Sequence, residues 1–172
     1  MGTGGVVIAD PFVEFKMSLE QKIIEMIDTG VDELREEAIS LQRQFQMFGT
    51  HVKAKMDQNA RGTLMVLVKA RGKNTFEICW RKKQWIRLNN PKPGKSPWVL
   101  YSRYIKKGKS DHYEMKPLLS GAKDWEREMV PELEDGFAEI RRKLRCLMKC
   151  RQLLLEQSRR TERLAVSEKC GE

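Results

Sequence analysis

The segment NTFEICWRKKQWIRL, residues 74–88, decides the fold class of this 172-residue chain. It is rich in β-branched and aromatic residues, and Phe76, Ile78 and Trp80 alternate with Glu77 and Cys79, the period of a strand with one buried face. Two similar segments, TLMVLVKA (63–70) and PWVLYSRYIKK (97–107), flank it across the turn sequences ARGKN and NNPKPGKS. The middle of the chain therefore predicts three antiparallel strands in a meander, with a short fourth strand around residues 112–115 as an option.

Helical periodicity lies on both sides of this sheet. Over residues 18–48 apolar residues recur at alternating spacings of four and three, and Ser18 followed by Gln21 predicts the start. A second seam has the same spacing, interrupted by Arg151. The fold class we expect is α+β in the order α-β-β-β-α, a three-stranded or possible four-stranded antiparallel sheet flanked by two long helices. The first seam is Ile27, Val31, Leu34, Ala38, Leu41, Phe45 and Phe48, and the second is Leu133, Phe137, Ile140, Leu144, Leu147, Arg151 and Leu154.

The length predicts a single domain over residues 18–157, with a helix at 18–48, a basic sheet at 61–116 and a C-terminal helix at 122–157. We expect residues 1–17 to be an extension or disordered, and residues 158–172 to be a frayed tail. Pro131 leaves two alternatives: the second helix begins near it, or a shorter helix from about Ala122 is kinked there. The seams pair within the chain or form a homodimer, and the sequence does not say which.

Targeting signals are missing from the sequence. There is no run of 18 apolar residues and no secretory leader, so we expect a cytoplasmic protein that does not enter a membrane. The four cysteines, Cys79, Cys146, Cys150 and Cys170, lack the spacing of a zinc site and are expected to be reduced.

Positive charge is concentrated in the predicted sheet. The chain has a net charge of +9, but residues 61–116 alone hold 15 basic and 3 acidic side chains, a balance of +12. Trp85, Trp98, Tyr101 and Tyr104 are interleaved with these cations, and aromatic rings stack on bases where cations neutralise phosphates. This pattern predicts DNA binding; a basic interface for an acidic protein and a solvated surface are the alternatives. The predicted contacts are Arg81, Lys82, Lys83, Arg87, Lys95, Arg103, Tyr104, Lys106, Lys107 and Lys109.

Two finer predictions concern orientation. Tyr101 and Tyr104 point to opposite faces of a strand, and we expect only Tyr104 to be exposed because Tyr101 shares its face with Val99 and Ile105. The C-terminal helix adds a second basic cluster, which either lies along DNA or is simply the solvated face of an amphipathic helix. Its predicted contacts are Arg141, Arg142 and Arg145.

Catalytic motifs are missing as well. The chain has two histidines and no glycine-rich phosphate loop, nucleophile elbow or histidine cluster, so we expect no enzyme activity, no cofactor and no metal. Two alternatives remain: an RNA-binding or translational regulator using the same sheet, and a small metal-dependent nuclease using Glu77, Asp111 and Glu114.

The segments YSRYIKKGKSDHY (101–113) and AKDWEREMVPELEDGFAEIRRKLRCLMKCRQLL (122–154) resemble the MobI proteins of conjugative plasmids and integrative conjugative elements. The resemblance spans about residues 61–155 and is carried by YIKKG, by DWE (124–126) and by the pattern E-D-x-F-A-x-I-R. It implies a non-catalytic accessory factor that acts on DNA at the origin of transfer and assists a separate relaxase.

Overall fold

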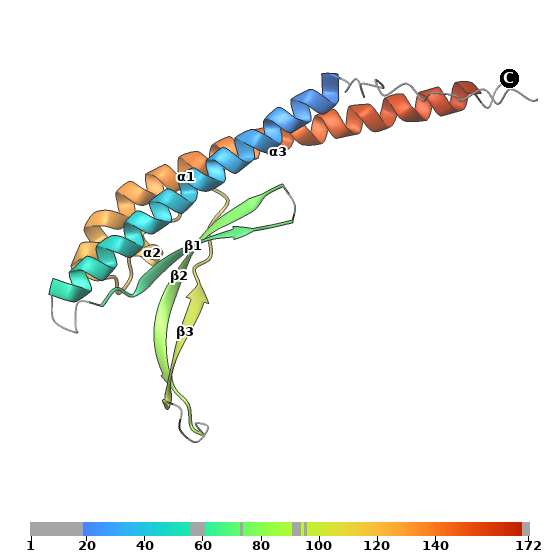
Figure 1. The fold of residues 1–172 in the computed structure, drawn as a ribbon. Coiled ribbons are helices and arrows are strands. Elements are labelled where there is room, and N and C mark those ends of the chain that lie inside the picture. The colour runs from blue at the N-terminus through green and yellow to red at the C-terminus, as the bar shows by residue number, and fades with distance from the viewer. Residues whose placement is uncertain (1–18, 56–60, 73, 91–93, 95, 170–172) are drawn as a thin grey trace, which may run out of the picture.

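The computed structural model describes residues 19–55, 61–72, 74–90, 94 and 96–169. Its elements are α1 (Leu19–Lys55), β1 (Leu64–Ala70), β2 (Phe76–Arg87), β3 (Trp98–Tyr104), α2 (Met115–Leu118) and α3 (Asp124–Lys169). The α+β class and the order α-β-β-β-α are confirmed. Figure 1 shows α1 and α3 side by side, with the sheet against one end of the pair. The expected cap at Ser18 and the extension at residues 1–17 lie outside the described residues.

The two long helices pair antiparallel within the chain. Arg151, in the second half of α3, donates from Nε to Asp28 Oδ1, in the first third of α1, at 2.8 Å. At the opposite ends, a Cβ added to Gly49 in α1 would lie 3.1 Å from the Trp125 ring in α3. The two predicted seams thus face each other, and Arg151, the polar interruption of the second seam, has an ionic partner.

Both helices are longer than their periodicity predicts. α1 continues to Lys55, beyond the expected end at residue 48, and α3 continues to Lys169, beyond the expected end at residue 157. Pro131 lies inside α3. Its missing hydrogen bond costs about 3 kcal/mol, and burial of the neighbouring Val130, Leu133 and Phe137 offsets that cost. No helix in the described ranges has a stretch both long and apolar enough to cross a membrane.

The sheet is the predicted antiparallel meander, in the order β1-β2-β3. The option of a fourth strand around residues 112–115 is wrong. Tyr113 is buried there, its N–H donates to Glu134 Oε1 at 2.8 Å, and the short helix α2 follows. Because a carboxylate of α3 takes this N–H, it has no part in a strand ladder.

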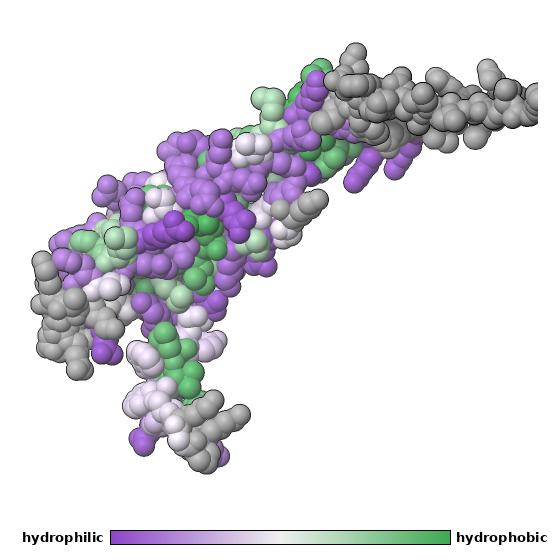
Figure 2. Space-filling view, in the orientation of Figure 1, coloured by the Kyte–Doolittle hydropathy of each residue, from purple (hydrophilic) through white to green (hydrophobic). Residues whose placement is uncertain are grey.

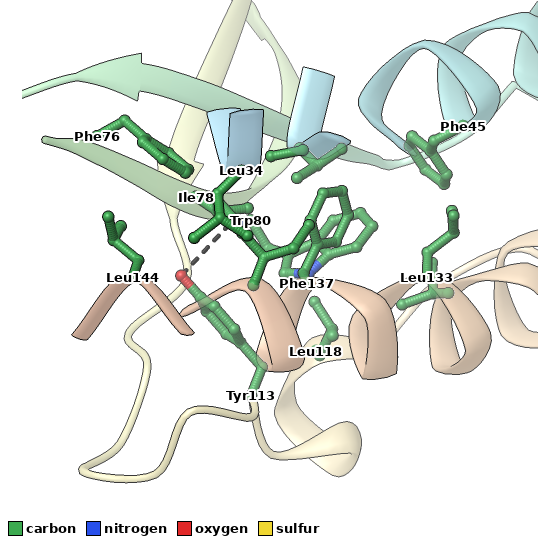
Figure 3. Packing of buried hydrophobic residues seen from close by; sticks show 14 of the residues in the cluster. Leu34, Phe45, Phe76, Ile78, Trp80, Tyr113, Leu118, Leu133, Phe137 and Leu144 are labelled. Carbon is green, nitrogen blue, oxygen red and sulfur yellow. Dashed lines mark hydrogen bonds between the residues drawn. The ribbon is translucent and has the colours of Figure 1, made fainter. Parts of the chain in front are cut away.

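Helices α1 and α3 cover one face of one end of the sheet. Phe76, Ile78 and Trp80 are buried on that face, as their alternation predicts. Figure 3 shows Trp80 in the middle of this core, with Tyr113 approaching its backbone. The ring centroids of Phe45 and Phe137 lie 5.2 and 5.9 Å from that of Trp80, both edge-on. Edge-on packing of this kind adds to the stabilisation that area burial provides.

A fully buried carboxylate, Glu134, organises the polar part of the core. It accepts from Trp80 Nε1 at 2.6 Å, from the Tyr113 N–H at 2.8 Å and from the Arg141 guanidinium at 2.8 Å. Each donor comes from a different part of the chain, since Trp80 is in β2, Tyr113 precedes α2 and Arg141 is in α3. A buried charge is tolerated when it is paired and hydrogen-bonded, as this one is.

A second buried carboxylate, Glu126, ties the start of α3 to the start of β1. It accepts from the backbone N–H groups of Lys123 and Leu64 at 2.9 and 2.7 Å and from Thr63 Oγ1 at 3.0 Å. The bond from Lys123 is the carboxylate half of a capping box, which satisfies a free N–H group of the helix terminus. The same side chain therefore caps the start of α3 and holds the start of β1 beside it.

Candidate nucleic-acid interface

Strands β2 and β3 extend beyond β1 as a two-stranded arm, which we define as residues 83–102. β1 pairs with β2 as far as Lys82, opposite Leu64, and from Lys83 to Arg87 β2 pairs with β3 alone. Figure 1 shows the arm pointing away from both helices. Trp85 on one face of the arm is 59% exposed and Tyr101 on the other is 53% exposed, so neither face is covered.

The arm gathers most of the exposed apolar surface of the described residues. Thirteen large hydrophobic side chains are exposed, and eight of them lie between residues 85 and 104. Figure 2 shows apolar surface on the arm below the mainly hydrophilic body. Exposed apolar side chains concentrated on one segment indicate a contact site, because they add nothing to the stability of the protein alone. The eight are Trp85, Ile86, Leu88, Trp98, Val99, Leu100, Tyr101 and Tyr104.

The two tyrosines correct one prediction. Tyr104 is 45% exposed, as expected, but Tyr101 is exposed as well. The expectation of a single exposed tyrosine assumed that one face of the whole sheet is buried. Tyr101 is opposite Gln84, beyond the last pair that β1 makes with β2.

Register places cations on both faces of the sheet where the arm begins. Residues directly opposite each other on neighbouring strands share a face. Lys82 is opposite Arg103, and Arg81 is opposite Tyr104. Both faces at the base of the arm therefore hold a cation beside exposed side chains.

Five of the predicted DNA contacts are exposed and form no ion pair within the described part of the chain. They come from the arm, from the base of the arm, from the loop after β3 and from the outer side of α3. An unpaired cation on the surface is available to a phosphate without loss of an internal contact. The five are Arg87, Arg103, Lys106, Lys109 and Arg142.

Four others already have partners. Arg81 donates to the Ser102 carbonyl at 2.7 Å, and Lys82 and Lys107 donate to the carbonyls of Ser120 and Ser110. Arg145 forms an ion pair with Asp111, although most of its side chain is exposed. A further predicted contact, Lys95, lies outside the described residues.

Arg141 is a correction. It is only 8% exposed, its guanidinium pairs with Glu134 and lies over the Tyr113 ring at 5.1 Å, and it donates to the Asp111 carbonyl at 2.7 Å. Arg141 follows Phe137 by four residues, on the side of α3 that faces the core. Its prediction as a DNA contact is therefore wrong, and it belongs to the fold.

The loop after β3 brings the two basic clusters together. Asp111 contacts both Arg141 and Arg145, which holds this loop against α3. The pKa of Lys107 is lowered from its usual value, first by burial and then by the positive charges of Arg141 and Arg145. The cations of the loop and those of α3 are therefore neighbouring parts of one basic surface.

A groove of about 640 Å³ lies where the arm leaves the body. Among the described residues that line it, none is acidic and three are cations. Arg61 and Lys123 were missed by sequence reasoning because they come from separate segments that only folding brings beside the arm. Burial lowers the pKa of Lys83, against the opposing effect of Glu126. The lining residues used below are Gln46, Arg61, Lys83, Trp85, Lys123 and Trp125.

The carboxylates that a metal-dependent nuclease would use do not form a cluster in the described residues. Glu77 accepts from Arg71 Nε at 2.8 Å, and Asp111 pairs with Arg145. Across residues 19–55, 61–72, 74–90 and 96–169, no three side chains of His, Cys, Asp or Glu converge on a point where a metal ion would bind.

Sequence comparison matches residues 34–155 to a family described as "MobI protein". The match covers more than half of the chain and includes all of the arm. Comparison with curated proteins gave no match, and neither did comparison with solved structures. The family name denotes a mobilisation-related protein. Two of the three motifs that carry the resemblance build the interior: Glu126 of DWE, and Glu134, Phe137 and Arg141 of E-D-x-F-A-x-I-R, are all buried.

Proposed function

The chain belongs to the MobI family, and from this premise we propose that it is a non-catalytic DNA-binding accessory factor of conjugative transfer. In this proposal the protein binds DNA at the origin of transfer and assists a separate relaxase, which cleaves the DNA. The arm and the adjoining basic loop make the contact.

The single observation that supports DNA binding is the composition of the uncovered arm and its base. Exposed aromatic rings such as Trp98 and Tyr104 stand beside exposed cations such as Arg87 and Arg103. Cations bind phosphates and release counterions, while rings stack on bases or pack on sugars. An acidic protein partner would account for the exposed cations but not for the several exposed aromatic rings beside them.

The test is a salt titration of Arg103→Ala/Lys106→Ala/Lys109→Ala, a variant that removes three exposed cations. Each phosphate contact contributes about 0.9 to the slope of log affinity against log salt on duplex DNA. We expect the variant to lower this slope by about 2 to 3. The matched control is Lys22→Ala/Arg35→Ala/Arg43→Ala, which removes three exposed cations of α1 and the same net charge.

Equal slopes for the wild type, the variant and the control would show that this surface does not contact DNA phosphates. Titration onto an origin-of-transfer fragment, an unrelated duplex and an RNA of the same length separates the alternatives. Preference for the origin fragment supports the proposal, and preference for the RNA supports a translational regulator instead.

The non-catalytic role has its own test. Supercoiled DNA incubated with the purified protein and magnesium, manganese or zinc should stay uncut, and it should be nicked only when the relaxase is added. Cleavage by the protein alone that is lost in Asp111→Ala would contradict the proposal.

A further inference from the structure

The groove at the base of the arm is lined by residues of the arm together with residues of the body. Five parts of the chain form it: the end of α1, the segment before β1, β1 itself, the arm, and the start of α3. Its volume of about 640 Å³ is within the range of about 300–1,000 Å³ typical of sites for small ligands. The groove is therefore large enough to enclose one nucleotide.

One wall of the groove offers a free aromatic ring and the other a fixed one. Trp85 is 59% exposed and is free to stack on a flat ligand. Trp125 packs on Phe45, with ring centroids 5.4 Å apart. A Cβ added to Gly62 would lie 2.5 Å from the Trp125 ring, so only glycine fits beside it. The Trp125 ring is therefore held in place and forms a rigid wall of the groove.

The cations of the groove suit an anionic ligand. Arg61, Lys83 and Lys123 line it. Lys83 is half-buried, and no carboxylate of the described residues forms an ion pair with its ammonium group. Burial lowers its pKa, which is the unfavourable effect of removing a charge from water. A phosphate beside this ammonium group would offset that effect.

We propose that this groove binds an unpaired nucleotide of single-stranded DNA, with the base stacked on Trp85 and its phosphates near Lys83, Arg61 and Lys123. The inference rests on the proposed DNA-binding function and adds to it a preference for unpaired DNA. In a duplex both faces of a base are already stacked and its pairing edge is occupied, so a paired base cannot enter the groove without the cost of leaving the stack.

The first test compares Trp85→Ala with Trp98→Ala. Both tryptophans lie on the same face of the arm and are similarly exposed, 59% and 51%, but only Trp85 lines the groove. Affinities are measured for a short oligothymidylate and for a paired duplex of the same length. Stacking contributes about 1–3 kcal/mol per base, so Trp85→Ala should weaken oligothymidylate binding by about tenfold to a hundredfold. The ratio of single-strand to duplex affinity should fall by about tenfold to a hundredfold in Trp85→Ala and by clearly less in Trp98→Ala, whose ring lies on the arm but does not line the groove. Equal falls in the two variants would reject the groove.

The second test uses the same substitution at two positions of α1, Gln46→Glu and Gln44→Glu. Both side chains are exposed, but only Gln46 lines the groove, and residues two apart point to opposite sides of a helix. The new carboxylate at residue 46 should repel the phosphates and weaken oligothymidylate binding by about threefold to tenfold at low salt. Gln44→Glu should bind like the wild type.

The outcomes separate this inference from the proposed function. If the wild type binds DNA but Trp85→Ala and Gln46→Glu keep its single-strand preference, the groove assignment is wrong and the proposed function stands. If the wild type binds neither the oligothymidylate nor the duplex, the groove assignment and the proposed function are both wrong. If oligouridylate binds more tightly than oligothymidylate with the same sensitivity to the two variants, the groove takes RNA and the assignment to DNA fails. Unchanged circular dichroism and melting temperature in all four variants show that the fold is intact.

Discussion

Strand β2 contains two tryptophans five residues apart that have opposite surroundings. Trp80 is fully buried between Phe45 and Phe137, and Trp85 is 59% exposed on the arm. The strand and the residue type are the same at both positions. Because they are five residues apart, the two rings lie on opposite faces of the strand. Helices cover the face of Trp80, whereas Trp85 lies on the other face, beyond the last pair that β1 makes with β2. A tryptophan in a strand is thus a core residue or a contact residue according to its face and to the elements that pack on that face.

Truncation of each ring should show the largest difference between the two sites. Trp80→Ala should lower the free energy of unfolding by about 4 kcal/mol, because it leaves a large cavity in the core. Trp85→Ala should change that free energy by less than about 1 kcal/mol. Urea denaturation followed by circular dichroism measures both. Equal losses of stability would mean that the arm is packed against something in solution.

The two arginines that follow Ile140 repeat the comparison on α3. Arg141→Ala leaves Glu134 in the core without its ionic partner and should lower the free energy of unfolding by about 3 kcal/mol. Arg142→Ala removes an exposed side chain and should change stability by less than about 0.5 kcal/mol. Thermal melting compares the two variants. We expect Arg142→Ala, unlike Arg141→Ala, to weaken DNA binding while it melts like the wild type.

The tyrosine at the base of the arm gives a smaller effect, which is measured on DNA binding. Tyr104→Ala should weaken binding to single-stranded DNA by about 1–2 kcal/mol and leave the salt slope unchanged, because stacking releases no counterions. Tyr104→Phe keeps the ring and should bind like the wild type. A lower salt slope in Tyr104→Ala would mean that the loss of the ring displaces a phosphate contact.

Alkaline pH should have the smallest effect on stability, and we expect it to act through a buried phenol of the body. The pKa of Tyr113 is raised above its usual value of 10.0, first by burial and then by a hydrogen bond with Tyr104. The folded state keeps this phenol neutral above pH 10.0, whereas the unfolded state ionises it, so the free energy of unfolding falls as the pH rises above that value. Tyr113→Phe should show a shallower decline over the same range in urea titrations. An equally steep decline would assign it to other groups, such as Cys79, whose pKa burial also raises.

The sequence by itself determined the elements and their order. Alternation of Phe76, Ile78 and Trp80 predicted the strand and its buried face, and the four-three spacing from Ile27 to Phe45 and from Leu133 to Leu144 predicted two helices that bury those residues. These features are local, because the period of a backbone fixes which side chains share a face. For the same reason, the extent of the helices beyond residues 48 and 157 was missed, since the apolar seams end at Phe48 and Leu154.

Only the tertiary structure decided which basic and aromatic side chains remain available to a partner. Arg141 and Arg142 are equally basic, yet one is buried with Glu134 and the other exposed. The groove joins Gln46, Trp85 and Lys123, which no spacing along the chain relates. Burial and proximity depend on contacts between segments far apart in sequence. The positive charge of the middle segment was therefore readable from composition, whereas the surface that presents it was not.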